Sequence, residues 1–260
     1  MRILITDAVL TDQAQWPDLE TLLDCARRYR CYIDAVNPAI LLANLWFDQA
    51  DRRRQQEWLY VTSWAAQDAA LYRLHTMVAD IAADPAAIPY PKISLPDAID
   101  LVSRPAVLWV ENDRNDRRFL LSMMPSEQRK MFLELEERWI FRFESRGGLG
   151  ELRKALEEIT SRGSLDPRMN RAMFDSDGEV PNHCSDDALA MIKFCDASGL
   201  IPYHLTRRAI ENYIPGRALL EWAEASGKKR AERIKRVRAF LRMNEAQRCH
   251  FRMKSGWDST

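Results

Sequence analysis

Four short apolar runs, separated by helical stretches, constrain the fold of this chain most strongly. They span residues 107–110, 139–143, 171–174 and 201–205. Runs of this length with turn-forming residues behind them indicate buried strands. Between them, apolar residues recur at the three-to-four-residue spacing of amphipathic helices. The alternation predicts an α/β fold with a mainly parallel four-stranded sheet flanked by helices.

The length of 260 residues allows one large domain or two small ones. Four prolines between positions 84 and 96 indicate a linker, and we expect a domain boundary there. Before it, a strand is predicted over residues 3–10 and helical spacing dominates from 38 to 83. We therefore predict a mostly helical N-terminal region over 1–100 that contacts a partner or a second copy, the α/β domain over 104–216, and a basic helical C-terminal segment over 217–260.

The net charge of zero conceals an uneven distribution. From Lys228 onward there are eleven Lys and Arg residues but only three acidic ones. Such a basic segment favours contact with nucleic acid or with an acidic partner. Residues 228–251 have the apolar spacing of one helix, and a solvated helix face would explain the same cations.

The compartment and membrane status follow from what the chain lacks. No apolar run reaches eighteen residues, so no membrane span is expected. The N-terminus turns acidic too early for a signal peptide. Five scattered cysteines without zinc-finger spacing favour a reducing environment. We therefore expect a cytoplasmic protein.

Carboxylates follow two of the predicted strands directly. The first run ends in Glu111, with Asp113 and Asp116 close behind, and the third ends in Asp175 and Asp177 around a serine. Ligands of open α/β sheets gather at the carboxyl ends of the strands, and hard cations take oxygen ligands. Alternate residues of an extended segment also point the same way. The pattern predicts a Mg²⁺ or Mn²⁺ site, although acidic residues are also common at helix starts.

A third polar cluster follows the last predicted strand. The segment from Arg207 to Tyr213 brings Arg, Glu, Asn and Tyr together. An ordinary helix start with a Glu–Arg pair would explain part of this composition. It would not explain the density of polar groups just beyond a buried strand.

These three motifs, in this order, resemble the Toprim domain shared by topoisomerases, primases and OLD-family nucleases. The resemblance covers about residues 104–216. The turn at Arg146, Gly147 and Gly148 is similar to the family's glycine turn, and residues 207–213 resemble an R-x-I-E-N-Y signature of OLD-like nucleases. The family's Glu is usually followed by Gly, whereas Asn112 follows it here. The lengthened turn leaves Asp113 or Asp116 as the second acidic ligand, and Asp116 is favoured because a helical pattern follows it.

The resemblance implies a Mg²⁺-dependent or Mn²⁺-dependent nuclease of the OLD-like branch. Bound ions of this kind activate water and stabilise charge on the scissile phosphate. No tyrosine is placed like a topoisomerase nucleophile, so hydrolysis is expected. The implied metal ligands are Glu111, Asp116, Asp175 and Asp177. The implied catalytic residues are Glu111, Asp175, Asp177, Glu211 and Arg208. The expected nucleic-acid contacts are Arg207, Lys228, Lys229, Arg230, Arg233 and Arg236.

The implied partners are a nucleic acid and a second protein. Similar Toprim effectors in bacterial anti-phage defence work with a separate ABC-type ATPase, and this chain has no nucleotide-binding motif of its own. The substrate is DNA or a structured RNA such as tRNA, and a homodimer is left open. One alternative is a non-catalytic Toprim-like scaffold that binds an ATPase or nucleic acid. Another is a doubly wound receiver-type protein, disfavoured because its phosphoacceptor Asp and downstream Lys are not evident.

Overall fold

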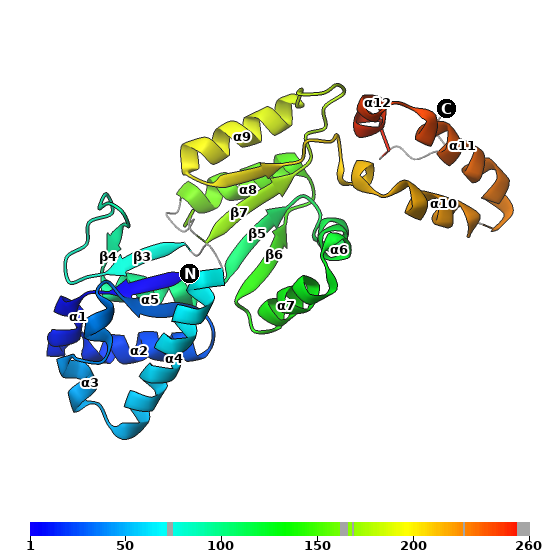
Figure 1. The fold of residues 1–260 in the computed structure, drawn as a ribbon. Helices are drawn as coiled ribbons and strands as arrows, with labels where there is room; N and C mark the ends of the chain where they lie inside the picture. The colour runs from blue at the N-terminus through cyan, green and yellow to red at the C-terminus, as the bar shows by residue number, and fades with distance from the viewer. Residues whose placement is uncertain (72–74, 162–165, 168, 226, 254–260) are drawn as a thin grey trace. The chain divides into compact units, whose positions relative to one another are not determined.

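The computed structural model describes residues 1–71, 75–161, 166–167, 169–225 and 227–253. The chain divides into two compact units, Met1–Pro105 and Ala106–Thr260 (Figure 1). The boundary follows the proline-rich stretch rather than lying in it. The reason is that β4 (Lys92–Ile93) and α5 (Leu95–Ser103) belong to the first unit.

The first unit is built around a parallel sheet of four strands in the order β2-β1-β3-β4. Its other strands are β1 (Arg2–Ile5), β2 (Tyr32–Ala35) and β3 (Thr76–Ala79). Helical residues outnumber strand residues here, but the expectation that residues 38–83 are helical throughout is wrong. The strand predicted over 3–10 also ends at Ile5. β3 and β4, with four and two residues, lie beside helical and proline-rich stretches, and the sequence pattern did not separate them from these neighbours.

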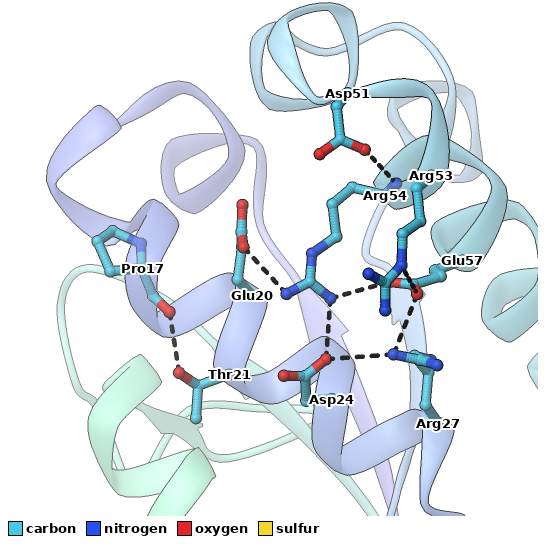
Figure 2. Close-up of polar contacts among 9 residues, drawn as sticks. All are labelled: Pro17, Glu20, Thr21, Asp24, Arg27, Asp51, Arg53, Arg54 and Glu57. Atoms are coloured by element: carbon cyan, nitrogen blue, oxygen red, sulfur yellow. Dashed lines mark hydrogen bonds and ion pairs between the residues drawn. The ribbon is translucent and has the colours of Figure 1, made fainter.

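An ion-pair network joins two helices of the first unit (Figure 2). Arg54 Nη1 lies 2.8 Å from Asp24 Oδ1 and 2.8 Å from Glu57 Oε2, and Nη2 lies 3.2 Å from Glu20 Oε2. The hydrogen bond to Asp24 raises the pKa of the Arg54 guanidinium above its ordinary value. The helices of this unit are α1 (Asp7–Thr11), α2 (Trp16–Arg27), α3 (Leu45–Gln49), α4 (Arg52–Leu71) and α5.

The second unit contains the predicted four-stranded parallel sheet, in the order β6-β5-β7-β8. Every strand end lies within two residues of its prediction, which confirms the α/β fold. The strands are β5 (Ala106–Val110), β6 (Phe141–Ser145), β7 (Asn170–Phe174) and β8 (Ile201–His204).

Helices lie on both faces of this sheet (Figure 1). One face packs against α8 and α9, whose buried side chains form a core with Trp109 and Phe174. Trp109 Nε1 also donates a hydrogen bond of 2.8 Å to Asn170 Oδ1, linking β5 to β7. The other face carries α6 and α7. The helices are α6 (Asp113–Met123), α7 (Ser126–Glu137), α8 (Leu149–Ser161) and α9 (Asp186–Ser198).

The basic C-terminal segment forms three helices, and the last two of them divide the single helix predicted over 228–251. They are α10 (Gly216–Glu224), α11 (Arg230–Arg242) and α12 (Glu245–His250). Asn244 interrupts the run because its Oδ1 accepts a hydrogen bond of 2.9 Å from the Gln247 amide, which starts α12. The segment belongs to the second unit. Of the predicted range, residues 226 and 254–260 lie outside the described part.

Both sheets have the same strand order by chain position: second, first, third, fourth. Thr6 and Glu111 follow the first strand of their units, and Asp80 and Asp175 follow the third. In the first unit, Lys92 Nζ donates a hydrogen bond of 2.9 Å to Asp80 Oδ2. Across the described helices, none combines the length and apolar character needed to cross a bilayer.

Candidate functional site

A cavity of about 360 Å³ lies at the carboxyl ends of the strands of the second unit. Four carboxylates line it, and all four were predicted from the sequence. They come from the ends of β5 and β7, from α6 and from the loop after β8: Glu111, Asp175, Asp116 and Glu211. The remaining lining residues are Asn112, Asn115, Gly147, Gly148 and Ile210.

Glu111 and Asp175 are held by backbone amides. Glu111 Oε1 accepts a hydrogen bond of 2.9 Å from the Asp175 amide, which joins the ends of the two central strands. Asp175 Oδ1 accepts one of 3.1 Å from the Ile210 amide, and the residue is only 6% exposed. Amide donors fix these carboxylates at the cavity before any ligand binds.

Asp116, not Asp113, reaches the cavity. Its Oδ2 accepts a hydrogen bond of 2.8 Å from the Asn112 amide, and the residue is buried, whereas Asp113 is exposed. Asn112 caps α6 by accepting a hydrogen bond of 3.0 Å from the Asn115 amide. Asn112 has φ −140°, an ordinary extended conformation, so the turn after β5 does not require the glycine usual in Toprim domains.

The glycine turn after β6 does require glycine. Gly147 and Gly148 have φ of 84° and 118°, values that side chains disfavour. The Gly148 amide donates a hydrogen bond of 3.1 Å to the Glu111 carbonyl, which holds the turn against the end of β5. The turn therefore forms one wall of the cavity from backbone.

Glu211 supplies the clearest sign that the cavity is built for a ligand. Its Oε2 is buried and accepts no hydrogen bond from the described residues. A buried carboxylate oxygen without a donor costs free energy, on the order of 1–3 kcal/mol or more. A cation or its water shell in the cavity would offset that cost.

Asp177 and Arg208 do not line the cavity. Asp177 has φ +48°, and its amide donates a hydrogen bond of 2.9 Å to the Arg208 carbonyl. The Arg208 guanidinium lies 3.6 Å from Glu179 Oε1 and 3.4 Å from the His250 carbonyl. The Arg208 guanidinium and the Asp177 backbone therefore connect loops of the unit.

Arg207 is likewise used within its own loop. Its guanidinium lies 4.7 Å from the centre of the Tyr213 ring and donates a hydrogen bond of 2.6 Å to the Asn212 carbonyl. The Tyr213 hydroxyl in turn accepts a hydrogen bond of 3.1 Å from the Arg207 amide. Of the R-x-I-E-N-Y segment, Glu211 and Ile210 reach the cavity, and the other polar residues hold the loop in shape.

Asn212 is a residue whose role the sequence did not reveal. It is 4% exposed, and its Oδ1 accepts a hydrogen bond of 3.1 Å from the Ala209 amide. Its Nδ2 donates to the carbonyls of Arg248 at 2.8 Å and Phe251 at 2.9 Å. One side chain thus joins the loop that carries Glu211 to α12.

The basic segment presents a different set of cations from the predicted one. Arg233 stacks over Trp222 at 4.5 Å, and Arg236 pairs with Glu232. Lys228, Lys229 and Arg230 are exposed, and their contact with nucleic acid stays a prediction. Three further exposed cations lie on α11: Lys235, Arg238 and Arg242.

The four cavity carboxylates suit a hydrated ion better than a closed cage. Within the described ranges, no group of three or more His, Cys, Asp or Glu side chains is placed to hold a metal ion directly. Mg²⁺ commonly keeps several waters and binds one or two carboxylates together with substrate phosphates. Oxygen donors around a cavity, one of them without a hydrogen-bond partner in the described part of the chain, fit that mode of binding.

Comparisons of the chain with protein-family models, with curated proteins and with solved structures give no match. The interpretation of this site therefore depends on its own geometry.

Proposed function

We propose that the second unit is a divalent-metal-dependent nuclease of Toprim type, which hydrolyses phosphodiester bonds in DNA or in a structured RNA such as tRNA. One observation carries the proposal. Four carboxylates from separate elements line one cavity at the carboxyl edge of a parallel sheet, and the buried Oε2 of one of them, Glu211, has no hydrogen-bond partner among the described residues.

Glu111 and Asp175 would hold the metal ion, since backbone amides already fix both. Asp116 and Glu211 would bind through water or complete a second position. Mg²⁺ or Mn²⁺ bound there supplies an activated water and stabilises charge on the phosphate. We leave Arg208 and Asp177 out of the metal site, because neither lines the cavity and the Arg208 guanidinium lies against Glu179.

The test uses substitutions that remove charge but keep shape. Plasmid, linear DNA and total tRNA are incubated with the full chain and Mg²⁺ or Mn²⁺, with and without chelator. The variants Glu111→Gln, Asp175→Asn and Glu211→Gln are compared with Glu137→Gln, an exposed carboxylate at the end of α7. Each cavity variant should lower metal-dependent cleavage about a hundredfold or more, as expected when several kcal/mol of charge stabilisation is lost.

Two outcomes would contradict this proposal. Cleavage that persists in all three cavity variants would refute the assigned site. A protein that neither cleaves nor binds Mn²⁺ by calorimetry would support the second candidate, a non-catalytic scaffold that binds an ATPase or nucleic acid. The scaffold is favoured by one observation, the lack of a direct three-ligand group in the described part of the chain.

The proposed context is bacterial anti-phage defence with a separate ABC-type ATPase as activator. It is supported by the family resemblance of residues 104–216. Repeating the cleavage assay with such an ATPase and ATP tests it, since activation should require both.

A further inference from the structure

The face of α11 that points away from its core carries a row of cations. Lys235, Arg238 and Arg242 are spaced by three and four residues, so they lie on one side of the helix. All three are exposed. The side chains that pack α11 onto the rest of the unit, Val237 and Phe240, belong to the opposite side. We call these three residues the basic row.

The basic row is not neutralised within the part of the chain that the structure describes. The acid nearest in sequence on α11, Glu232, pairs with Arg236 on another side of the helix. By contrast, the exposed pairs Arg153–Glu157, Lys154–Glu151 and Arg217–Glu221 of the same unit are closed at 2.8–3.1 Å. The row spans about 10 Å along the helix axis, a length that covers a few phosphates of a nucleic-acid strand.

The row is also fixed relative to the candidate site. Adding a Cβ to Gly216 would place it 2.7 Å from Leu241, so α11 packs closely against the start of α10. The Arg208 amide donates a hydrogen bond of 2.9 Å to the Cys249 carbonyl. Together with the Asn212 bonds to α12, these contacts tie the three C-terminal helices to the loop that carries Glu211.

We propose that the basic row binds the phosphate backbone of the nucleic acid on which the cavity acts. The inference rests on the proposed nuclease function for the identity of its ligand. It replaces the predicted contacts Arg233 and Arg236, which are engaged with Trp222 and Glu232, by three cations that face solvent. Binding of this kind is independent of sequence and weakens as salt rises, because each neutralised phosphate releases counterions.

The test measures binding with cleavage switched off. Fluorescence anisotropy follows a short labelled DNA duplex, and separately a labelled tRNA, in chelator over a range of salt concentrations. The triple variant Lys235→Gln, Arg238→Gln, Arg242→Gln is compared with Arg153→Gln, Lys154→Gln, Arg217→Gln. This control removes the same three charges, but from closed ion pairs. Thermal unfolding verifies that both variants are folded.

The row variant should bind roughly tenfold or more weakly, and its slope of log K against log salt should be shallower by about 2–3 on duplex DNA. The control should keep the slope of the wild type. Equal slopes for wild type and row variant would overturn the inference and leave the nuclease proposal standing. If binding depends on the basic row but no metal supports cleavage, the nuclease proposal would be overturned and the basic row would stand as a phosphate-binding surface. If the wild type binds neither the DNA duplex nor the tRNA, the basic row is not a nucleic-acid surface. An acidic protein would then be its expected partner.

Discussion

Replacing Asn212 with alanine should weaken the attachment of α12 to the loop that carries Glu211, leaving the Arg208 hydrogen bonds to the Cys249 and His250 carbonyls in place. The change removes the three hydrogen bonds of the amide, one of them buried and two partly buried. It leaves the Ala209 amide and the carbonyls of Arg248 and Phe251 without that partner. With about 1 kcal/mol lost for each such bond, the cost is on the order of 3 kcal/mol. That is a large share of the roughly 5–15 kcal/mol that stabilises a typical domain.

The loss should appear first as local opening, since few other bonds join these two segments. Hydrogen exchange followed by mass spectrometry should show faster exchange over residues 206–214 and 245–253. Urea unfolding should give a lower midpoint. Asn244→Ala is the matched control, because Asn244 is exposed and caps only the first turn of α12.

The control should cost about 1 kcal/mol and speed exchange only at the start of α12. If Asn212→Ala changed exchange in the loop no more than Asn244→Ala does, the coupling between loop and helix would be refuted.

Gly178→Ala should destabilise the loop after β7, because the added Cβ would lie 1.8 Å from the His183 carbonyl oxygen; a lower melting temperature than wild type checks this. Lys92→Met should flatten the acid dependence of stability in the first unit. Burial acts to raise the pKa of Asp80, but the Lys92 and Ile81 hydrogen bonds outweigh it and leave the pKa below its ordinary value. A carboxyl group whose pKa is lower in the folded than in the unfolded protein stabilises the fold above the unfolded pKa of about 3.9. This stabilisation is lost as the pH falls through the folded pKa. The urea midpoint should therefore fall less between about pH 5 and 3 in the variant than in the wild type. Arg54→Met should lower stability by about 1–2 kcal/mol in urea, less at high salt, because its ion pairs are partly exposed (Figure 2).

The second unit could be predicted from the sequence because its signals are local. Each strand from β5 to β8 is four or five residues long and is bounded by turn residues or helix caps. Glu111 and Asp175 directly follow strands that are neighbours in the sheet, so their convergence follows from the order of the elements. The first unit lacked such signals. Thr76–Ala79 comes shortly after the twenty-residue helix α4, and β4 has only two residues.

The site residues that the sequence misplaced depend on torsion angles and helix phase. Asp177 was expected beside Asp175 because alternate residues of a strand share a side, but the strand ends at Phe174 and Asp177 is left-handed. Arg208 was expected at the phosphate, yet Glu179 and the His250 carbonyl hold it from distant parts of the chain. The number of Lys and Arg residues likewise does not show which of them face solvent. That depends on which side of α11 is packed by Val237 and Phe240.

The shared strand order of the two sheets gives the chain two acidic edges with different electrostatic states. In the first unit, the ammonium of Lys92 is covalently part of the protein and pairs with Asp80. In the second, Asp175 is held by amides, and Glu211 has an oxygen without a described donor. A dissolved divalent ion would therefore compete with a tethered cation at one edge and not at the other. The same strand order thus gives two different sheet edges. At the edge in the first unit, a lysine of the chain already pairs with the acid, and at the edge in the second unit, the net charge would depend on the concentration of dissolved cations.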